Sequence, residues 1–474
     1  MKNLEGPTAR LTHFVHGLEW ADVSPSAQAA VLNAVADNIA CMVAGSRTEL
    51  AAQTADVVRQ WGGTPQCAVV GQSFRTSAPL ASFINAVQAN ALDYDDAFER
   101  DGKGMGHPGS TIVPAALAAA QVAGSSGKEF LAAVVAGYEA ADRVIEAIQP
   151  TPARHGQVWG VAVHQSFGAA VAAGKLLGLE LTAFRNAFGL AGSLASVPAA
   201  RKWNWTTRPL SSLKDVVAPA AETGVRAAIL AAAGWQGSRD ILDGEKGFWI
   251  MAGSDRCDFD LLTDRLGSRW TIEEVSLKPY PACRWLHAAL EALEDAVADQ
   301  SIRAEDILEI EVATFAEVVE NFADRRPASM IDAEFSVPWG VAAIVAGLPK
   351  GPDWYSRQTL SDPRLHAIAD KVTLRVDEEA QRRHFSDERK SMSAVRIRTA
   401  TGWSVERRVP VACGGVSSPW PVGGLEKKFA SCLEPTLGAK DAARLQHLLL
   451  GLADLKELSP VIDLIEVTDR GRPS

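Results

Sequence analysis

The sequence predicts a mainly α protein, with a large all-α helical domain and a smaller α+β domain inserted before the C-terminal helices. Residues 24–266 are rich in Ala, Leu and Val at helical spacing, which is typical of helices packed on helices. β-branched and alternating stretches, typical of strands, begin near Trp270. A helical pattern returns after Gly414 and Gly415, and we expect this last segment to rejoin the first domain.

Helix signals in the first half support the helical domain. Ser24 is a good N-cap and Pro25 suits a first turn, so a helix is expected from this point to Gly45. Small residues fall on several faces of three later segments, 113–123, 130–141 and 166–177. Because small faces allow helices to approach closely, we expect most of these helices to be buried.

The second domain is expected to mix strands with helices. The predicted strands are 307–315, 371–376, 394–399 and 403–411. The predicted helices of this region and of the last segment are 285–298, 338–346, 425–433 and 442–452. These changes of pattern assign residues 1–268 plus 415–474 to the helical domain and residues 269–414 to the α+β domain.

Composition narrows the class of partner. The chain has 474 residues, of which 47% are hydrophobic and 22% charged, enough for a substantial core. Its 47 basic and 57 acidic residues leave a net charge of -10, so no general positive field favours nucleic acid. An acidic protein that binds an anionic substrate must gather its cations locally. Lys and Arg residues in stiff or unusual motifs are therefore the first candidates for a binding site.

The cysteines and the N-terminal segment bear on cofactors and location. Six cysteines are scattered without a CxxC pair, so zinc-ribbon and cysteine-ligated iron–sulfur sites lack their usual spacing. We expect reduced thiols, no metal and no other cofactor. Residues 1–10 lack the apolar core of a signal peptide, and no run of 18 apolar residues appears. We expect a cytoplasmic protein that binds neither membranes nor nucleic acid.

The first candidate site lies in the segment NALDYDDAFERDGKGMGHPGSTIV, residues 90–113. Asp93, Asp95 and Asp96 stand near His107 between two helical stretches. Carboxylates and an imidazole brought together can serve as base, acid and orienting partner. The alternative is that the aspartates cap helices and keep a loop solvated.

The second candidate site is the motif KPYPACR, residues 278–284, where helical character gives way to α+β. Two prolines make a stiff turn that would hold Lys278 and Arg284 in fixed directions, which suits gripping carboxylates between domains. Tyr280 lies between these cations and is a candidate substrate-binding residue. The alternative is an exposed hinge with no ligand.

A third stretch, residues 201–214, interleaves cations with tryptophan and includes Arg208 and Lys214. Such a pattern can bind single-stranded nucleic acid by stacking, but the net charge of -10 argues against this interpretation. The cations remain candidates for binding a small anion.

Taken together, these segments resemble the MmgE/PrpD family, which includes 2-methylcitrate dehydratases, cis-aconitate decarboxylases and iminodisuccinate epimerases. The motifs of the resemblance follow in order along the chain: ALDYDDAF, GHPGSTIVPAALAAA, AGYEAADRV, AAGKLLGLE, AAETGVRAAILAA, LKPYPACRWLHAA, AEFSVPWGVAA and LEKKFA. The resemblance implies a large all-α domain, a smaller α+β lid domain inserted before the closing helices, a site between the two and usually a homodimer. Transferred residue by residue, it implies Asp93, His107 and Lys278 as catalytic residues. A further lysine of the family site falls near Lys214, with Arg208 as a competing alignment.

The sequence departs from the family pattern at two positions. Ala97 stands where a threonine often follows the DD pair, and Trp159 stands where decarboxylase-like members have a site histidine. His155 and His164 flank Trp159, and each is either a substitute for that histidine or a core histidine with satisfied hydrogen bonds. Tryptophan at this position would equally suit a bulkier or less polar substrate.

These residues predict a cofactor-independent lyase that abstracts a proton next to a carboxylate of a small polycarboxylate and eliminates water, like a 2-methylcitrate dehydratase. Lys278, with Arg284 or Lys214, would clamp carboxylates and stabilise an enolate-like intermediate. His107, oriented by Asp93, would move the proton. The alternatives are an epimerase of an iminodisuccinate-like acid, a cis-aconitate-type decarboxylase and a non-catalytic carboxylate-binding homologue. A metal-dependent version lacks an evident further ligand cluster in the sequence.

Overall fold

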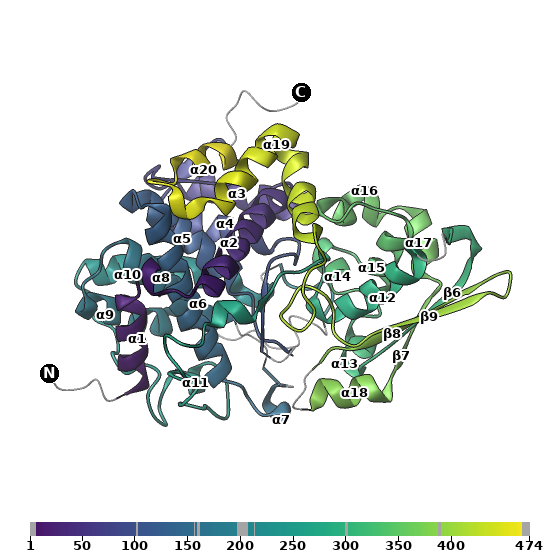
Figure 1. Cartoon of the computed structure of the whole chain (residues 1–474), viewed down its shortest axis with the longest axis horizontal. Coiled ribbons are helices and arrows are strands. Elements are labelled where there is room, and N and C mark those ends of the chain that lie inside the picture. The colour runs from purple at the N-terminus through teal and green to yellow at the C-terminus, as the bar shows by residue number, and fades with distance from the viewer. Residues whose placement is uncertain are drawn as a thin grey trace.

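The computed structural model describes residues 6–100, 103–155, 157–158, 162–196, 207–212, 214–298, 302–386 and 390–466. Helices make up 58% of the described residues and strands 9%, which confirms the mainly α fold class. Helices before residue 270 gather on one side of the molecule, and the largest sheet lies at the opposite end (Figure 1).

The helical part is built around α8 (Ala162–Leu176), which packs against α5 (Gly109–Ala123), α6 (Gly127–Ala147) and α10 (Val217–Ala232). Small residues make the contact close. A Cβ atom added to Gly168 would lie 2.5 Å from the backbone oxygen of Gly137, too near for any other residue at this crossing. The small faces expected from the sequence therefore do bring α6 and α8 together.

The remaining helices of this part surround that centre. The predicted helix after Ser24 is confirmed as α2 (Pro25–Gly45), with the Ser24 hydroxyl accepting a hydrogen bond from the Ala27 N–H. The others are α1 (Pro7–Gly17), η1 (Trp20–Asp22), α3 (Glu49–Trp61), α4 (Ala78–Asn90), α7 (Pro152–His155), α9 (Leu181–Leu194), η3 (Lys214–Val216), α11 (Phe248–Met251) and η4 (Thr271–Glu274).

Two small sheets lie among these helices, so the part predicted as all-α is not purely helical. One pairs β1 (Cys67–Ala68) with β2 (Arg75–Thr76). The other has the order β4-β3-β5 and joins β3 (Ala97–Arg100), β4 (Lys103–Gly104) and β5 (Val275–Ser276). The pairing of β3 with β5 is antiparallel and brings residues 97–98 beside residues 275–276. This ladder carries the two most promising sequence motifs to one place.

The α+β part holds a four-stranded sheet of order β7-β6-β8-β9, and all four predicted strands are confirmed. They are β6 (Ile307–Thr314), β7 (Val372–Val376), β8 (Ser393–Thr399) and β9 (Ser404–Val409). Strand β6 pairs with β7 in parallel, and the other pairs are antiparallel. The helices of this part are η5 (Arg284–Leu286), α12 (His287–Ala298), η6 (Ala304–Asp306), α13 (Ala316–Asn321), α14 (Met330–Glu334), α15 (Val337–Val345), η7 (Pro352–Tyr355), α16 (Arg357–Leu360), α17 (Pro363–Ala369) and α18 (Glu378–Phe385).

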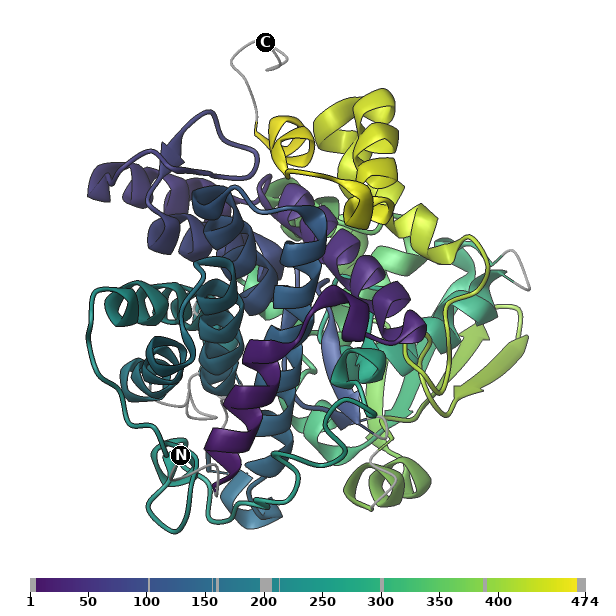
Figure 2. The ribbon, with the colours of Figure 1, turned by 60° about the vertical axis from the view of Figure 1, so that its left-hand side comes forward.

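The last segment returns to the helical part. Helix α19 (Gly424–Leu450) packs on α2, as Figure 2 shows for the yellow and purple helices, and is followed by η8 (Leu452–Asp454) and α20 (Ser459–Ile465). A positive φ of 76° at Gly438 interrupts α19 between the two helices predicted from the sequence. The domain boundaries after residues 268 and 414, and the role of the α+β part as a lid, stay predictions.

Helix α2 has the length and apolar composition to cross a membrane, but 72% of its most apolar window is buried inside the protein. It contacts α4, α5, α6 and α19. These contacts identify α2 as a core helix of the bundle.

Candidate active site

Lys278 and Asp93 form a buried ion pair between two segments that are distant in sequence. Asp93 follows α4 and has a positive φ of 48°, which turns its backbone carbonyl as well as its side chain towards the lysine. The Lys278 Nζ donates to Asp93 Oδ1 at 2.6 Å and to the Asp93 carbonyl at 2.9 Å. The two side chains are 0% and 2% exposed, so each charge depends on the other for compensation.

His107 lies beside this pair, in the turn between β4 and α5. Its Nδ1 is 3.3 Å from Asp95 Oδ2 and 3.1 Å from the Asp96 carbonyl. Its Nε2 is 3.9 Å from Asp93 Oδ1 and 3.7 Å from Asp215 Oδ2. The imidazole side chain is 14% exposed. Nδ1 thus faces Asp95 and the Asp96 carbonyl, and Nε2 faces Asp93 and Asp215, so the orienting role predicted for Asp93 stays a prediction.

The charges around His107 keep it protonated at neutral pH. Burial and the Lys278 ammonium oppose protonation, but the carboxylates of Asp95 and Asp215 outweigh them and raise the pKa of His107 to about 9. An imidazolium held in this way is a proton donor at neutral pH. A ring in this state can donate a proton from Nε2.

Buried hydrogen bonds of Asp96 fix the loop that carries these residues. Asp96 Oδ1 accepts the Gly109 N–H at 3.1 Å, and Asp96 Oδ2 accepts the Tyr138 hydroxyl at 2.7 Å. A Cβ atom at Gly109 would lie 2.5 Å from Asp96 Oδ1, so glycine is required for this contact. Burial, with Asp95 nearby, raises the pKa of Asp96 to about 7. Asp96 thus ties the start of α5 to α6, and positions His107 between them.

Helix α19 holds the same loop from the other side. Lys428 donates to the Tyr94 carbonyl at 2.8 Å, and its Nζ lies 2.5 Å from Asp37 Oδ1 on α2. Its ammonium also lies 4.2 Å from the centre of the Tyr94 ring. The Tyr94 hydroxyl in turn donates to the Pro279 carbonyl at 3.4 Å, next to Lys278. The loop is therefore held by α19, whose Lys428 is itself paired with Asp37 of α2.

Comparison with known proteins also divides the chain into an N-terminal and a C-terminal part. The pattern of the MmgE/PrpD N-terminal domain matches residues 9–259, and that of the MmgE/PrpD C-terminal domain matches residues 280–454. The chain belongs to the MmgE/PrpD family. Members of this family similar to the chain include proteins named cis-aconitate decarboxylase.

Three of these relatives cover most of the chain at low identity. The cis-aconitate decarboxylase of Aspergillus terreus is 23% identical over 97% of this chain and 96% of its own length. That of Homo sapiens is 23% identical over 98% of this chain and 95% of its own length. That of Mus musculus is 25% identical over 78% of this chain and 76% of its own length. The likeness extends through both parts of the fold.

The three catalytic residues predicted for an MmgE/PrpD protein lie together, and a fourth residue joins them. Asp215, at the start of the α10 region, was not singled out from the sequence, although it stands next to the candidate Lys214. It is buried and has a positive φ of 56°, a backbone conformation that non-glycine residues seldom adopt. The resemblance drew attention to cations in this stretch, so the adjacent carboxylate was missed.

Arg284 lies near the site but has a carboxylate partner of its own. Its Nε donates to Glu99 Oε1 at 2.6 Å, and its Nη1 donates to the Cys413 carbonyl at 2.8 Å. The guanidinium thereby joins β3 to the segment after β9. Its predicted contact with substrate stays a prediction. His287, next along the chain, hydrogen-bonds the Ala282 carbonyl through Nε2 at 3.0 Å. Burial, with Arg284 and Lys278 beside it, lowers the pKa of His287 well below the ordinary value and keeps it neutral.

The other predicted substrate-binding residues lie in different surroundings. The Tyr280 hydroxyl donates to Glu294 Oε2 at 2.5 Å, and Arg208 Nη1 donates to Asp332 Oδ1 at 2.9 Å. His164 is buried with its ring edge-on to Phe248, at 5.8 Å between centres. Trp159, the segment 201–206 and the side chain of Lys214 lie outside the described residues. The roles proposed for these residues in substrate binding stay predictions.

Three groups of the site have a spacing that a metal ion could use. One ligand atom from each of Asp93, His107 and Asp215 can be chosen so that all lie within 4.8 Å of one another. However, the Lys278 ammonium already lies 2.6 Å from Asp93 Oδ1 and would repel a cation. The donor set therefore suits a proton-transfer network better than a divalent metal.

Proposed function

We propose that this MmgE/PrpD protein is a cofactor-independent lyase that moves a proton at carbon next to a carboxylate of a small polycarboxylate, with loss of water. The observation that carries the proposal is a partly buried imidazolium, His107, beside the Lys278–Asp93 pair and Asp215. Such a group combines a proton donor, a fixed cation and a second carboxylate in one site. These are the parts that an acid–base elimination needs.

Each residue has a defined task in the proposed elimination. The Asp215 carboxylate accepts the proton from carbon, and the electron pair of that bond forms the carbon–carbon double bond. The C–O bond of the β-hydroxyl breaks, and His107 donates its Nε2 proton to the leaving oxygen, which departs as water. Lys278 stabilises the negative charge that develops on the substrate carboxylate, and such a preorganised cation contributes several kcal/mol, on the order of 3 kcal/mol.

Decarboxylation is the second candidate, supported by the relatives named cis-aconitate decarboxylase. In that reaction a carboxylate leaves as carbon dioxide, and His107 protonates the carbanion that remains. The imidazolium is again the acid, so the site geometry serves both reactions. The tryptophan at position 159 gives the chain a different side chain where decarboxylase-like members have a histidine, and for this reason we place dehydration first.

Epimerisation and ligand binding without catalysis are further outcomes of the same test. An epimerase would remove a proton from one face of a carbon and return a proton to the other face, and a binding protein would hold the acid without exchanging its protons. The proposal also includes a homodimer in the cytoplasm, which light scattering and cell fractionation test directly.

Proton NMR in deuterated water tests the proposal. The purified, chelator-treated protein is mixed with hydroxy-, imino- and unsaturated di- and tricarboxylates. Appearance of an unsaturated product from a hydroxy acid is expected, whereas release of carbon dioxide with deuterium at the same carbon would favour decarboxylation. Deuterium exchange without net product would favour an epimerase. Tight binding with no exchange by any acid would overturn the lyase proposal, and a His107→Gln protein measured in parallel is the control.

A further inference from the structure

Asp332, on α14 in the α+β part, holds the segment that leads to Asp215. Its Oδ1 accepts hydrogen bonds from Arg208 Nη1 and from the Leu210 N–H, both at 2.9 Å. Its Oδ2 accepts the Ser329 hydroxyl at 2.8 Å. Arg208 Nη2 also donates to the Asn321 carbonyl at 2.8 Å. Asp332 is fully buried, so these charge-assisted bonds are stronger than surface ion pairs.

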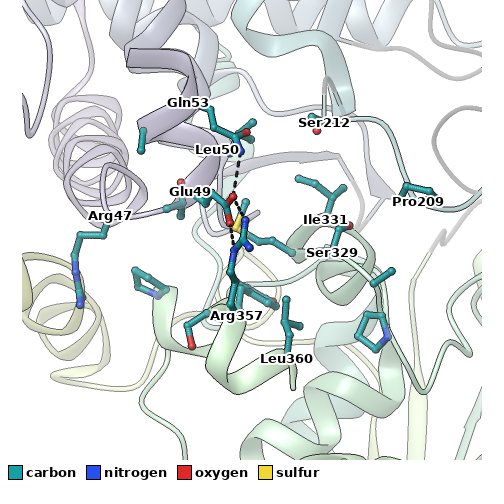
Figure 3. A pocket seen from close by; sticks show the side chains of 18 of the residues that line it. Arg47, Glu49, Leu50, Gln53, Pro209, Ser212, Ser329, Ile331, Arg357 and Leu360 are labelled. Carbon is teal, nitrogen blue, oxygen red and sulfur yellow. Dashed lines mark hydrogen bonds and ion pairs between the residues drawn. The ribbon is translucent and has the colours of Figure 1, made fainter. Parts of the chain in front are cut away.

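A cavity borders the segment that Asp332 holds. The cavity has a volume of about 980 Å³ and lies between α3, the 209–212 segment, α14 and α16. Figure 3 shows Pro209 and Ser212 around the same space as Ser329 and Ile331. Pro209 and Ser212 are themselves exposed. Open space borders this side of the segment, and the Asp332 bonds, together with the buried side chain of Leu210, attach the segment to the rest of the protein.

The turn after this segment is strained. Asp215 and Val216 are consecutive non-glycine residues with positive φ values of 56° and 58°. This conformation costs roughly 1–2 kcal/mol per residue, and a β-branched residue such as Val216 adopts it rarely. Strain of this kind persists only where the surroundings impose it. On the downstream side α10 is packed against α8, and the Thr111 hydroxyl donates to the Val217 carbonyl at 3.4 Å.

We propose that Asp332 and Arg208 are positioning residues that hold Asp215 against His107, so that the α+β part sets the geometry of the proton-transfer site. The upstream anchor at Leu210 and the downstream helix α10 together keep the strained turn closed. Release of the anchor lets residues 215–216 relax, and the Asp215 carboxylate moves away from Nε2 of His107. The catalytic consequence of this movement rests on the function proposed above, but the movement itself does not.

The charged groups around His107 make this movement measurable. Asp93, Asp95 and Asp96 belong to the loop after α4, and Lys278 follows β5. Asp215 is the one charged neighbour, among those with described side chains, that lies on the anchored segment. Loss of its carboxylate from this position removes one of the charges that favour the imidazolium.

Histidine NMR on the full-length protein tests the proposal. The protein has nine histidines, so ¹³C labelling of the imidazole ring resolves them, and His107→Gln assigns the signal. In Arg208→Gln and in Asp332→Asn, the pKa of His107 is expected to fall by about 0.5–1 unit from its value in the unaltered protein. With an acid that the unaltered protein turns over, kcat of both variants is expected to fall about tenfold while KM changes less. Arg208→Lys can keep one hydrogen bond, so its His107 pKa and its kcat should lie between those of Arg208→Gln and those of the unaltered protein.

Arg326→Gln is the matched control. It removes a different Arg–Asp pair of the α+β part, in which Arg326 Nη2 lies 2.5 Å from Asp370 Oδ2, and should leave the pKa of His107 unchanged. Thermal unfolding checks that each variant is folded, and Arg208→Gln decides the matter if Asp332→Asn does not fold. An unchanged His107 pKa in folded Arg208→Gln overturns the proposal, even in an active lyase. A shifted pKa in a protein that turns over no acid supports the positioning role and refutes the proposed function.

Discussion

The charged pairs of the candidate active site and those of the four-stranded sheet have the same chemistry in opposite surroundings. Lys278 and Asp93 are 2.6 Å apart with side chains 0% and 2% exposed. Arg396 on β8 and Glu406 on β9 are 2.7 Å apart with side chains 45% and 43% exposed. Water already solvates the second pair, so its net contribution to stability is small. The first pair has lost that solvation and is stable only as a pair.

The contrast shows that distance alone does not identify a functional ion pair. The Arg396–Glu406 pair on the sheet is nearly as short as the pair in the site, yet its exposure makes its net contribution to stability small. At the site, neighbouring carboxylates raise the pKa of His107 against the effect of burial, whereas burial itself, with Asp95 nearby, raises the pKa of Asp96. Substitutions in the two regions should therefore differ in kind as well as in size.

Replacing Lys278 should have the largest effect. In Lys278→Met the Asp93 carboxylate stays buried without its partner, which should destabilise the protein by about 3–5 kcal/mol. Turnover should fall by at least about 100-fold because the developing charge loses its cation. Urea unfolding and steady-state kinetics measure the two effects. Lys371→Met, which removes a lysine that donates to the Ala304 carbonyl beside the sheet, is the control and should retain turnover.

Replacing His107 should mainly affect chemistry. His107→Gln keeps a polar side chain of similar reach but cannot donate a proton as an acid, so kcat should fall about 10²–10⁴-fold. The control is His384→Gln, since His384 also lies near a carboxylate, 3.6 Å from Glu317, but on α18 beside the sheet. Near-normal kcat in His107→Gln would remove this residue from the mechanism.

The raised pKa of His107 predicts how stability depends on pH. In the folded protein the pKa of His107 is about 9, whereas the ordinary pKa of histidine is 6.5. The stabilisation that the His107 proton gives the folded protein is thus fully present below pH 6.5 and is lost as the pH rises through about 9. Over this window the unaltered protein should lose up to about 3 kcal/mol more unfolding free energy than His107→Gln. Parallel pH slopes in urea titrations of the two proteins would contradict the raised pKa.

The smallest effect is expected on the sheet. Arg396→Gln should change the free energy of unfolding by less than about 1 kcal/mol and leave turnover unaltered. A double-mutant cycle with Glu406→Gln isolates the pair, and the coupling should shrink further at high salt. A coupling as large as that of the buried pair would mean that exposure does not explain the contrast.

Much of the fold could be predicted because its patterns are long. Alanine-rich helices and the four strands of the main sheet extend over enough residues for their periodicity to appear. The β4-β3-β5 sheet could not be predicted, because β5 has two residues and its pairing depends on a contact with residues 97–98. The strands β1 and β2, with two residues each, could not be predicted for the same reason.

The site was partly predictable for a different reason. Motifs singled out Asp93, His107 and Lys278, but they carried no information on which carboxylate faces which nitrogen. The partner of Arg284 illustrates the limit, since Glu99 lies 185 residues away in sequence and meets it only through the fold. Asp215 needed the backbone as well, because its positive φ turns an otherwise ordinary aspartate towards His107.

The contact between Lys428 and Tyr94 also has a consequence for the order of events during synthesis. These residues are 334 positions apart, so at 5–20 residues per second the Asp93 loop leaves the ribosome roughly 20 seconds to a minute before its α19 anchor. During that interval the helices around α8 can assemble, but Lys428 is not yet present to pair with Asp37 or to hydrogen-bond the loop that carries Asp93. The helices around α8 can therefore pack before α19 fixes the Asp93 loop.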